Sequence, residues 1–323
     1  MFILKIDAVF EGGGVKGIAF AGAIAEVEQA GYTFENIAGT SAGAIVAALV
    51  AVGYTAEEIK IELEKLNYNK FKDARGLSKL TNILFKYGIY NGDYFEKWIE
   101  TLLKRKGITT FGQLITEYPE EKYKYKLQII ATDITNKRLL ILPQDLKYFE
   151  LDPDQFSIAK AVRMSMSIPL FFKPVKIKDN HGKEHVIVDG GVLSNYPIWL
   201  LDDNSSNPPW PTFGFKLIEP DKRQLKVGEK GRIKNLFNFL KYLIGTMLEA
   251  HDKLHISNSK GDFDRTIGIS TTIVNDGLEK EIKTTYFDIT KKESQLLYDN
   301  GKITAKQFLT TWNFEKWKDD YRR

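Results

Sequence analysis

Apolar positions in the first part of the chain alternate between strand-like and helix-like runs. Residues 2–10 form a mainly apolar run typical of a buried strand, and residues 18–30 form an Ala-rich apolar helix that Gly31 closes. A short strand at 36–38 and a second Ala- and Val-rich helix, ending at Val52, come next. Two strands joined by a helix form a right-handed βαβ unit, so this pattern predicts a parallel sheet.

The next stretch of chain contains two helix starts with a long insertion between them. Thr55 and Glu58 have the spacing of a capping box, as do Asp93 and Glu96, and each pair precedes an amphipathic run. Residues 68–90 between these helices have mixed polarity and no clean period. We therefore expect a helical cap insertion over the sheet at 68–90.

The remainder of the chain continues the alternation of strands and helices. Strands are predicted at 124–133, 137–142, 172–178, 184–188 and 212–218, and helices at 156–164, 232–256 and from 291 onwards. The segments 172–178 and 184–188 read as a hairpin around a polar turn. Strands that alternate with helices predict an α/β fold of three layers, α/β/α, around a mainly parallel sheet, in one domain spanning 1–323.

Composition and charge narrow the possible functions. The chain is 43% hydrophobic and 27% charged and has no cysteine, which excludes disulfides, cysteine-bound zinc, iron–sulfur clusters and a thiol nucleophile. The net charge of +4 comes without a dense Lys/Arg stripe, so no nucleic-acid partner is expected. No apolar window is long enough for a membrane span, and a cytoplasmic location is the plainer expectation.

One basic segment stands out from this even charge distribution. Between Lys222 and Lys241 there are seven basic residues against one acid, Glu229, next to apolar positions at helical spacing. Such a segment is most often a core helix with a solvated face. The alternative is peripheral contact with an anionic membrane through 222–244.

Four glycines cluster where the first strand meets the first helix. Gly12, Gly14 and Gly17 match a dinucleotide-binding pattern, but the acidic ribose ligand expected about 20 residues later is missing. A phosphate-binding P-loop fails as well, because Lys16 is followed by Gly17 and not by Ser or Thr. We therefore expect no nucleotide cofactor. Together with Gly13, the cluster exposes more backbone N–H groups than a tight turn needs, and these suit a phosphate or an oxyanion.

A second glycine-rich turn follows the second predicted strand. Gly39, Ser41 and Gly43 fit the GxSxG pattern of a nucleophile elbow, with a strand before it and a helix after it. Taken alone, Ser41 is equally well explained as an ordinary N-cap serine. The βαβ connection places both turns at one sheet edge, however, with a nucleophile beside oxyanion donors. That arrangement is what acyl transfer requires.

No histidine is a strong candidate for the base. His251 and His255 lie four residues apart in a predicted helix, without the third ligand that zinc needs or the loop context of a triad. Surface or core positions explain them better than a metal or triad role. We expect His181 and His185 to be solvated turn and strand residues.

Asp189 is a better candidate base than any histidine. It ends an apolar strand and is followed by Gly190 and Gly191, so its carboxylate emerges at a strand terminus. A simple Asp-Gly turn is the alternative on local sequence alone. Partial burial would raise the pKa of Asp189 and let it accept the Ser41 proton.

Several separate blocks of this sequence together resemble the patatin-like phospholipase family of lipid acyl hydrolases. The matching blocks are Gly12 to Gly17, Gly39 to Gly43, Ala131-Thr132-Asp133, Ser165 to Pro174, Asp189-Gly190-Gly191 and Asn195-Tyr196-Pro197. Their order agrees with the family from about residue 6 to residue 220, the recognisable catalytic core. Residues 221–323 form a C-terminal extension of helices and strands in which little is recognised.

The resemblance implies roles for individual residues. Ser41 and Asp189 would form a catalytic dyad without histidine, and Gly12, Gly13 and Gly14 would form the oxyanion hole. Lys16, Gly17, Gly39, Gly43, Gly190 and Gly191 would support these motifs. Lys16 could act electrostatically near the loop, although a solvated lysine is the commoner arrangement. No metal or other cofactor is implied.

The expected reaction is hydrolysis of a fatty-acyl ester of a phospholipid or another acyl lipid through an acyl-enzyme, as in a phospholipase A or lysophospholipase. An acyltransferase or thioesterase would use the same dyad on another acceptor or ester. A lipid-binding regulatory module with a vestigial site is a further alternative, although such a module has no need of both Gly motifs, Ser41 and Asp189.

Overall fold

The computed structural model describes residues 4–66, 70, 87–118, 120–203, 205–218, 261–284 and 286–322. Most of the predicted cap insertion at 68–90 lies outside these residues. The basic segment 222–244, the predicted helix 232–256, His251 and His255 lie outside them entirely.

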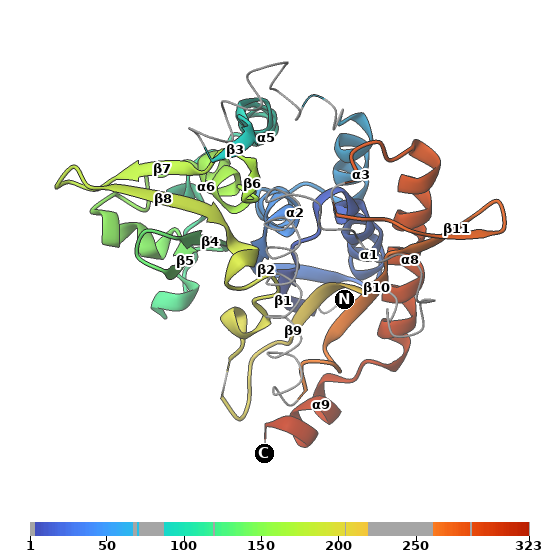
Figure 1. Cartoon of the computed structure of the whole chain (residues 1–323). Coiled ribbons are helices and arrows are strands. Elements are labelled where there is room, and N and C mark those ends of the chain that lie inside the picture. Colours follow the sequence, from blue (N-terminus) through green and yellow to red (C-terminus); the bar gives the residue numbers. More distant parts are fainter. Residues whose placement is uncertain are drawn as a thin grey trace.

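A mainly parallel sheet forms the centre of the described structure (Figure 1). Its strands run in the order β10-β9-β1-β2-β4-β8-β7, and β5 pairs with β4. The strands are β1 (Leu4–Phe10), β2 (Tyr32–Thr40), β4 (Leu127–Asp133), β5 (Arg138–Leu142), β7 (Val175–Lys178), β8 (Glu184–Asp189), β9 (Thr212–Ile218) and β10 (Thr266–Ser270). The five strands from β10 to β4 are parallel, while β5, β7 and β8 pair antiparallel. The expected mainly parallel sheet is confirmed.

Helices cover the sheet, and smaller strand pairs flank it. The helices are α1 (Ile18–Gln29), α2 (Ala42–Ala51), α3 (Ala56–Lys65), α5 (Asp93–Arg105), α6 (Ile158–Ser165), α8 (Lys291–Thr311) and α9 (Phe314–Tyr321). The additional strands are β3 (Gly88–Tyr90) with β6 (Leu170–Phe172), and β11 (Thr272–Asn275) with β12 (Leu278–Glu281).

Alternation along the strands divides the core between the two faces of the sheet. Ala8 and Phe10 of β1 belong to the large cluster with α1 and α2, while Val9 between them joins a smaller cluster. The smaller cluster includes Ile198 and Leu201 of a short 3₁₀ helix, η7 (Ile198–Leu201), which packs against β1, β2 and β9. The sheet is thus covered on both sides, which confirms the three-layer fold.

The C-terminal part of the chain is built into this core. Strand β10 extends the sheet beside β9, and α8 lies against α1. Two glycines allow this close approach, because a β-carbon on Gly22 would lie 1.9 Å from the Tyr298 carbonyl oxygen and one on Gly301 would lie 2.0 Å from that of Ala19.

Local predictions were mostly confirmed, with three differences. Thr55 and Glu58 form both bonds of the predicted capping box. Asp93 lies in the first turn of α5 and is not its cap, because Gly92 occupies that position with φ of 80°. The predicted strand 36–38 extends over the whole of β2, because pairing with β1 extends it. The predicted strand 172–178 divides into β6 and β7 around Pro174, which has no N–H to donate.

In the described part of the chain, no helix combines the length and apolarity that a membrane crossing requires.

Candidate active site

The two glycine-rich turns lie side by side at the carboxyl ends of β1 and β2. Phe10 pairs with Gly39 in the parallel register, so the residues after each strand emerge at the same level. A β-carbon on Gly12 would lie only 3.1 Å from Cβ of Ser41. The predicted adjacency of loop and elbow is confirmed, and Gly12 must lack a side chain for it to exist.

Ser41 adopts the sharp backbone turn of a nucleophile elbow. Its φ of 54° and ψ of −124° are rare for a residue with a side chain and cost roughly 1–3 kcal/mol. A β-carbon on Gly39 would lie 2.5 Å from the Gly43 carbonyl oxygen, and one on Gly43 would lie 2.3 Å from that of Phe10. Both glycines of the motif are therefore required by close backbone packing around the serine.

A hydrogen-bond chain from α6 holds the elbow in place. The Ser41 N–H donates to Oγ of Ser165 over 2.8 Å, and that hydroxyl donates to the Ile130 carbonyl over 2.6 Å. Ser165 is fully buried. The sequence marked Ser165 only as part of a motif, and its contact with Ser41 across 124 positions could not be derived locally.

Asp189 ends β8 next to this elbow and is held by its own backbone contacts. Its N–H donates to the Ser167 carbonyl over 3.0 Å, and its Oδ1 accepts the Gly191 N–H over 2.8 Å. A β-carbon on Gly190 would lie 2.3 Å from the Ile130 carbonyl oxygen, so this turn also depends on glycine. Oδ2 of Asp189 is buried and accepts no hydrogen bond from the described residues.

Burial raises the pKa of Asp189 to about 7, against the lowering effects of the Ser41 side chain and the Gly191 N–H. The strand register makes the two residues neighbours, because Thr40 pairs with Ile130 of β4 and Asp189 pairs with Ala131, the next residue of that strand. The Ser41 Oγ lies 3.5 Å from the sulfur of Met166. The site therefore pairs a serine hydroxyl with a buried carboxylate that titrates near neutrality.

The glycine loop has two backbone N–H groups, instead of the expected three, that no described residue accepts. The Gly12 N–H donates to the Asn195 carbonyl over 3.0 Å, which removes it from the expected oxyanion hole. The Val15 N–H donates to the Thr284 carbonyl over 3.1 Å. The N–H groups of Gly13 and Gly14 donate to no described residue, and Gly14 has φ of 58°. Gly13 and Gly14 remain the candidate oxyanion donors.

Asn195 fixes the position of this loop. Besides accepting from Gly12 through its carbonyl, it donates from Nδ2 to the Gly12 carbonyl over 3.3 Å. The sequence singled out Asn195 as part of a motif without a role. Its two bonds to Gly12 show that it positions the loop.

The environment of Lys16 differs from the one predicted. It is 3% exposed, so the expectation of a solvated lysine is wrong. The local sequence also does not reveal that the neighbouring Val15 bonds to Thr284, far along the chain.

His185 is the second residue whose environment was predicted wrongly. His181 is exposed, as expected, but His185 is buried on the same face of β8 as Asp189. Its Nδ1 lies 3.1 Å from Oδ2 of Asp133 and its Nε2 lies 3.3 Å from Oδ2 of Asp179. The first contact joins β8 to β4 and the second joins it to the β7–β8 turn, both at the end of β8 away from Asp189. His185 is therefore a structural residue and not a base for Ser41.

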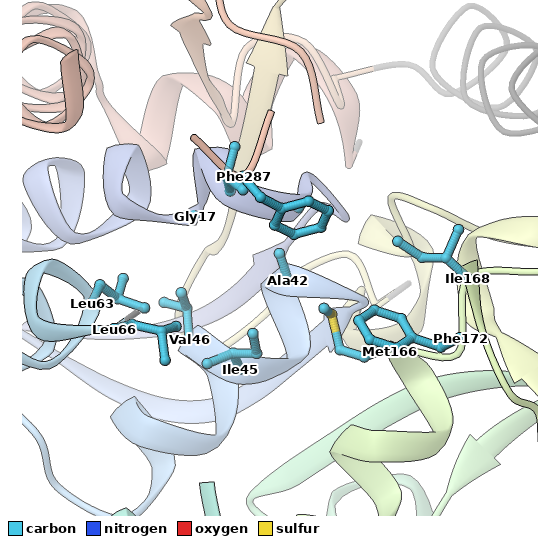
Figure 2. Close-up of a pocket in the computed structure, with 12 residues that line it drawn as sticks. Gly17, Ala42, Ile45, Val46, Leu63, Leu66, Met166, Ile168, Phe172 and Phe287 are labelled. Atoms are coloured by element: carbon cyan, nitrogen blue, oxygen red, sulfur yellow. The ribbon is translucent and has the colours of Figure 1, made fainter. Parts of the chain in front are cut away.

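An apolar pocket is lined in part by Ala42, the residue that follows the serine (Figure 2). Figure 2 shows Met166, Ile168 and Phe172 at one end, and Leu63 and Leu66 at the other. The lining residues are Gly14, Val15, Gly17, Ala42, Ile45, Val46, Leu63, Leu66, Met166, Ile168, Phe172 and Phe287. Met166 connects the pocket to Ser41 Oγ, and Gly14 connects it to the candidate oxyanion donors. The chemistry that these surfaces suit is acyl transfer with an apolar acyl group.

No group of three His, Asp or Glu side chains within the described ranges has the geometry to hold a metal ion.

Comparison with known proteins identifies the family of this chain. The sequence model of the family described as patatin-like phospholipase matches residues 8–202, which include both glycine turns and Asp189. The chain belongs to the patatin-like phospholipase family. This family membership places it among lipid hydrolases.

Similar proteins extend the match beyond the family segment. Uncharacterized protein YqhO of Bacillus subtilis (strain 168) is 39% identical over 317 residues, covering 96% of this chain and 100% of the relative. Probable lipid hydrolase 463L of Invertebrate iridescent virus 6 is 28% identical over 194 residues, covering 59% of this chain and 61% of the relative. The crystal structure of VipD from Legionella pneumophila has a TM-score of 0.57 at 18% identity, covering 95% of this chain and 67% of that chain. The last comparison shows that the fold is shared.

Proposed function

We propose that this protein is a lipid acyl hydrolase of the phospholipase A or lysophospholipase type, with Ser41 as nucleophile and Asp189 as base. The observation that carries the proposal is the pairing of a strained elbow serine with a buried carboxylate that adjoins it and whose Oδ2 accepts no hydrogen bond from any other described residue. Such a carboxylate is ready to accept the proton of a neighbouring hydroxyl.

In the first half of the reaction, Oδ2 of Asp189 takes the Ser41 proton while Oγ bonds to the ester carbonyl carbon. The carbonyl oxygen becomes an oxyanion that the N–H groups of Gly13 and Gly14 stabilise. As the tetrahedral intermediate collapses, Asp189 returns the proton to the leaving alcohol. The acyl group then remains on Ser41, with its chain directed into the apolar pocket.

In the second half, water replaces the alcohol and attacks the acyl-enzyme carbonyl. Asp189 takes a proton from that water and returns it to Ser41 Oγ as the fatty acid leaves. The raised pKa of Asp189 suits both directions of transfer near pH 7. None of these steps uses the buried His185.

The test is release of free fatty acid from mixed phospholipid vesicles in the presence of a chelator, followed by mass spectrometry. The wild-type protein should release fatty acid, and Ser41→Ala should lower the rate at least ~10³-fold. The matched control is Ser294→Ala, which changes a buried serine of α8 and should retain the wild-type rate. Hydrolysis by Ser41→Ala at the wild-type rate would overturn the proposal.

The same assay with an added lysolipid or alcohol separates hydrolysis from acyl transfer. A hydrolase yields mainly free fatty acid, because water completes the reaction. Acylated acceptor as the main product would instead assign transferase activity to the dyad. The predicted membrane contact through 222–244 stays a prediction, to be tested by vesicle binding with that stretch deleted.

A further inference from the structure

Two residues from the C-terminal part of the chain reach the candidate active site, although the family match ends at residue 202. Thr284 contacts the glycine loop, and Phe287 lines the apolar pocket. Both follow the β11–β12 hairpin and precede α8. The walls of the site are therefore not built by the family segment alone.

Thr284 fixes this part of the chain against the oxyanion loop. Its carbonyl accepts the Val15 N–H over 3.1 Å, and a β-carbon on Gly14 would lie 2.0 Å from the same oxygen. Just before it, fully buried Ile282 donates its N–H to the Thr271 carbonyl over 3.1 Å. These contacts hold Thr284 at a fixed position next to Gly14.

Phe287 extends from this anchor over the pocket. Its ring stacks on Phe171, with centroids 5.0 Å apart and an interplanar angle of 26°. Figure 2 shows the ring close to Ala42, the residue that follows the nucleophile. The aliphatic walls Ile45 and Leu63 lie in helices α2 and α3, whereas Phe287, like Ile168, lies outside the helices and strands and is partly exposed. Phe287 is therefore a pocket side chain that can move without moving a helix or a strand.

The part of the pocket that the described residues line is too small for a long acyl chain in this arrangement. Its cavity volume of about 20 Å³ is enough for roughly one water molecule. A chain of many methylenes enters only if a lining side chain moves aside. Withdrawal of Phe287 from Ala42 would open the pocket without disturbing a helix or the sheet.

We propose that Phe287 determines acyl-chain specificity by closing the pocket beside Ser41 against long chains. This inference rests on the proposed function, because it concerns the acyl group that Ser41 would carry. Thr284 sets the position of Phe287 through its contact with the oxyanion loop. The preferred substrates are then esters of short fatty acids, and esters of long fatty acids are disfavoured.

The test compares kcat/KM for p-nitrophenyl esters of butanoic and hexadecanoic acids. Phe287→Ala should raise the ratio of long-chain to short-chain kcat/KM about tenfold or more, because each admitted methylene adds apolar burial. Phe287→Trp should lower that ratio, because a larger ring fills more of the pocket. Opposite shifts from two variants cannot come from a general loss of folding.

Phe308→Ala is the matched control for removal of an aromatic ring. Phe308 lies in α8 and packs against Phe213 and Trp312, away from the pocket lining. It should leave the chain-length ratio unchanged. An unchanged ratio in both Phe287 variants would overturn the inference while leaving the proposed hydrolase intact.

A binding assay keeps the two proposals separable if the wild-type protein hydrolyses neither ester. The probe is cis-parinaric acid, a long-chain fatty acid that fluoresces when it enters an apolar site. Added to Ser41→Ala, the change Phe287→Ala should tighten its binding about fivefold or more. Equal affinity in the single and double variants would overturn the role of Phe287, and tighter binding would support it even without turnover.

Discussion

Asp7 in β1 and Asp189 at the end of β8 are both buried, and burial raises the pKa of each to about 7. Their hydrogen bonds differ. Oδ1 of Asp7 accepts both the backbone N–H of Asn36 over 3.0 Å and its side-chain Nδ2 over 2.8 Å, and the side chain of Trp210 also lowers the pKa of Asp7. Oδ2 of Asp189 accepts no bond from the described residues and adjoins a strained serine.

This difference separates a structural carboxylate from a candidate base. A raised pKa reports only that the charged form is poorly solvated. Oδ1 of Asp7 ties β1 to β2 through both donors of Asn36, and the side chains that lower its pKa by hydrogen bonding are those of Trp210 and Asn36, neither of which is a nucleophile. Asp189 retains lone pairs on Oδ2 that no other described residue uses, and this availability makes it the candidate base.

The largest expected effect comes from replacing each aspartate by asparagine. An amide cannot accept the serine proton, so Asp189→Asn should lower kcat at least ~10³-fold on a soluble ester. Asp7→Asn keeps an oxygen that can accept from Asn36 and should change kcat less than about threefold. Equal losses in the two variants would remove the distinction between the two carboxylates.

The next effect is the dependence of rate on pH. The base must be ionised, so kcat/KM should rise with pH below about 7 and level off above it, changing about a hundredfold between pH 5 and 8. Asp7→Asn should show the same profile, because Asp7 does not take part. A profile measured with a soluble ester that is flat, or that shifts in Asp7→Asn, would contradict this assignment.

A smaller loss of activity should follow from removing the side chain that restrains the Ser41 backbone. Ser165→Ala removes the hydroxyl that joins the Ser41 N–H to the Ile130 carbonyl, so the elbow loses a restraint. We expect kcat to fall roughly 10- to 100-fold with KM little changed, because misplacement affects the reacting atoms more than substrate binding. Ser294→Ala serves again as the control, and an unchanged kcat in Ser165→Ala would show that the restraint is dispensable.

The smallest effect is one that the two aspartates should share. The pKa of each carboxyl group is higher in the folded state than in the unfolded state. Each group therefore contributes fully to the free energy of unfolding below about pH 4, and this contribution is lost as pH rises through about 7. Relative to wild type, both Asn variants should therefore gain Tm as pH rises from 4 to 8, by roughly 2–6 °C at pH 8. Calorimetry of all three proteins at both pH values measures this. A Tm difference between variant and wild type that falls as pH rises would contradict the prediction.

The sequence predicted those features of the site that depend on chain connectivity. The βαβ unit placed the Gly12 loop beside Ser41 because parallel neighbours end at one edge of a sheet. The capping box of Thr55 and Glu58 could be predicted because its two hydrogen bonds lie within four residues of sequence. Asp189 at a strand terminus followed from the apolar run before it and the glycines after it.

The features that were missed depend on contacts between distant parts of the chain. The burial of Lys16 and His185, the bond from Ser41 to Ser165 and the docking of Thr284 on Val15 all join elements far apart in sequence. A hydrogen bond from Gly12 to Asn195 likewise removed one expected oxyanion donor. Local patterns specify elements and turns, but they do not specify which side chain covers which loop.

The most direct test of the central claim is covalent labelling with a fluorophosphonate, followed by intact-mass measurement and peptide mapping. Wild type and Asp7→Asn should each gain one adduct, located on Ser41, and Asp189→Asn should remain unlabelled over the same time. An adduct on another residue, or equal labelling of Asp189→Asn, would contradict the assignment of Ser41 and Asp189 as a catalytic dyad.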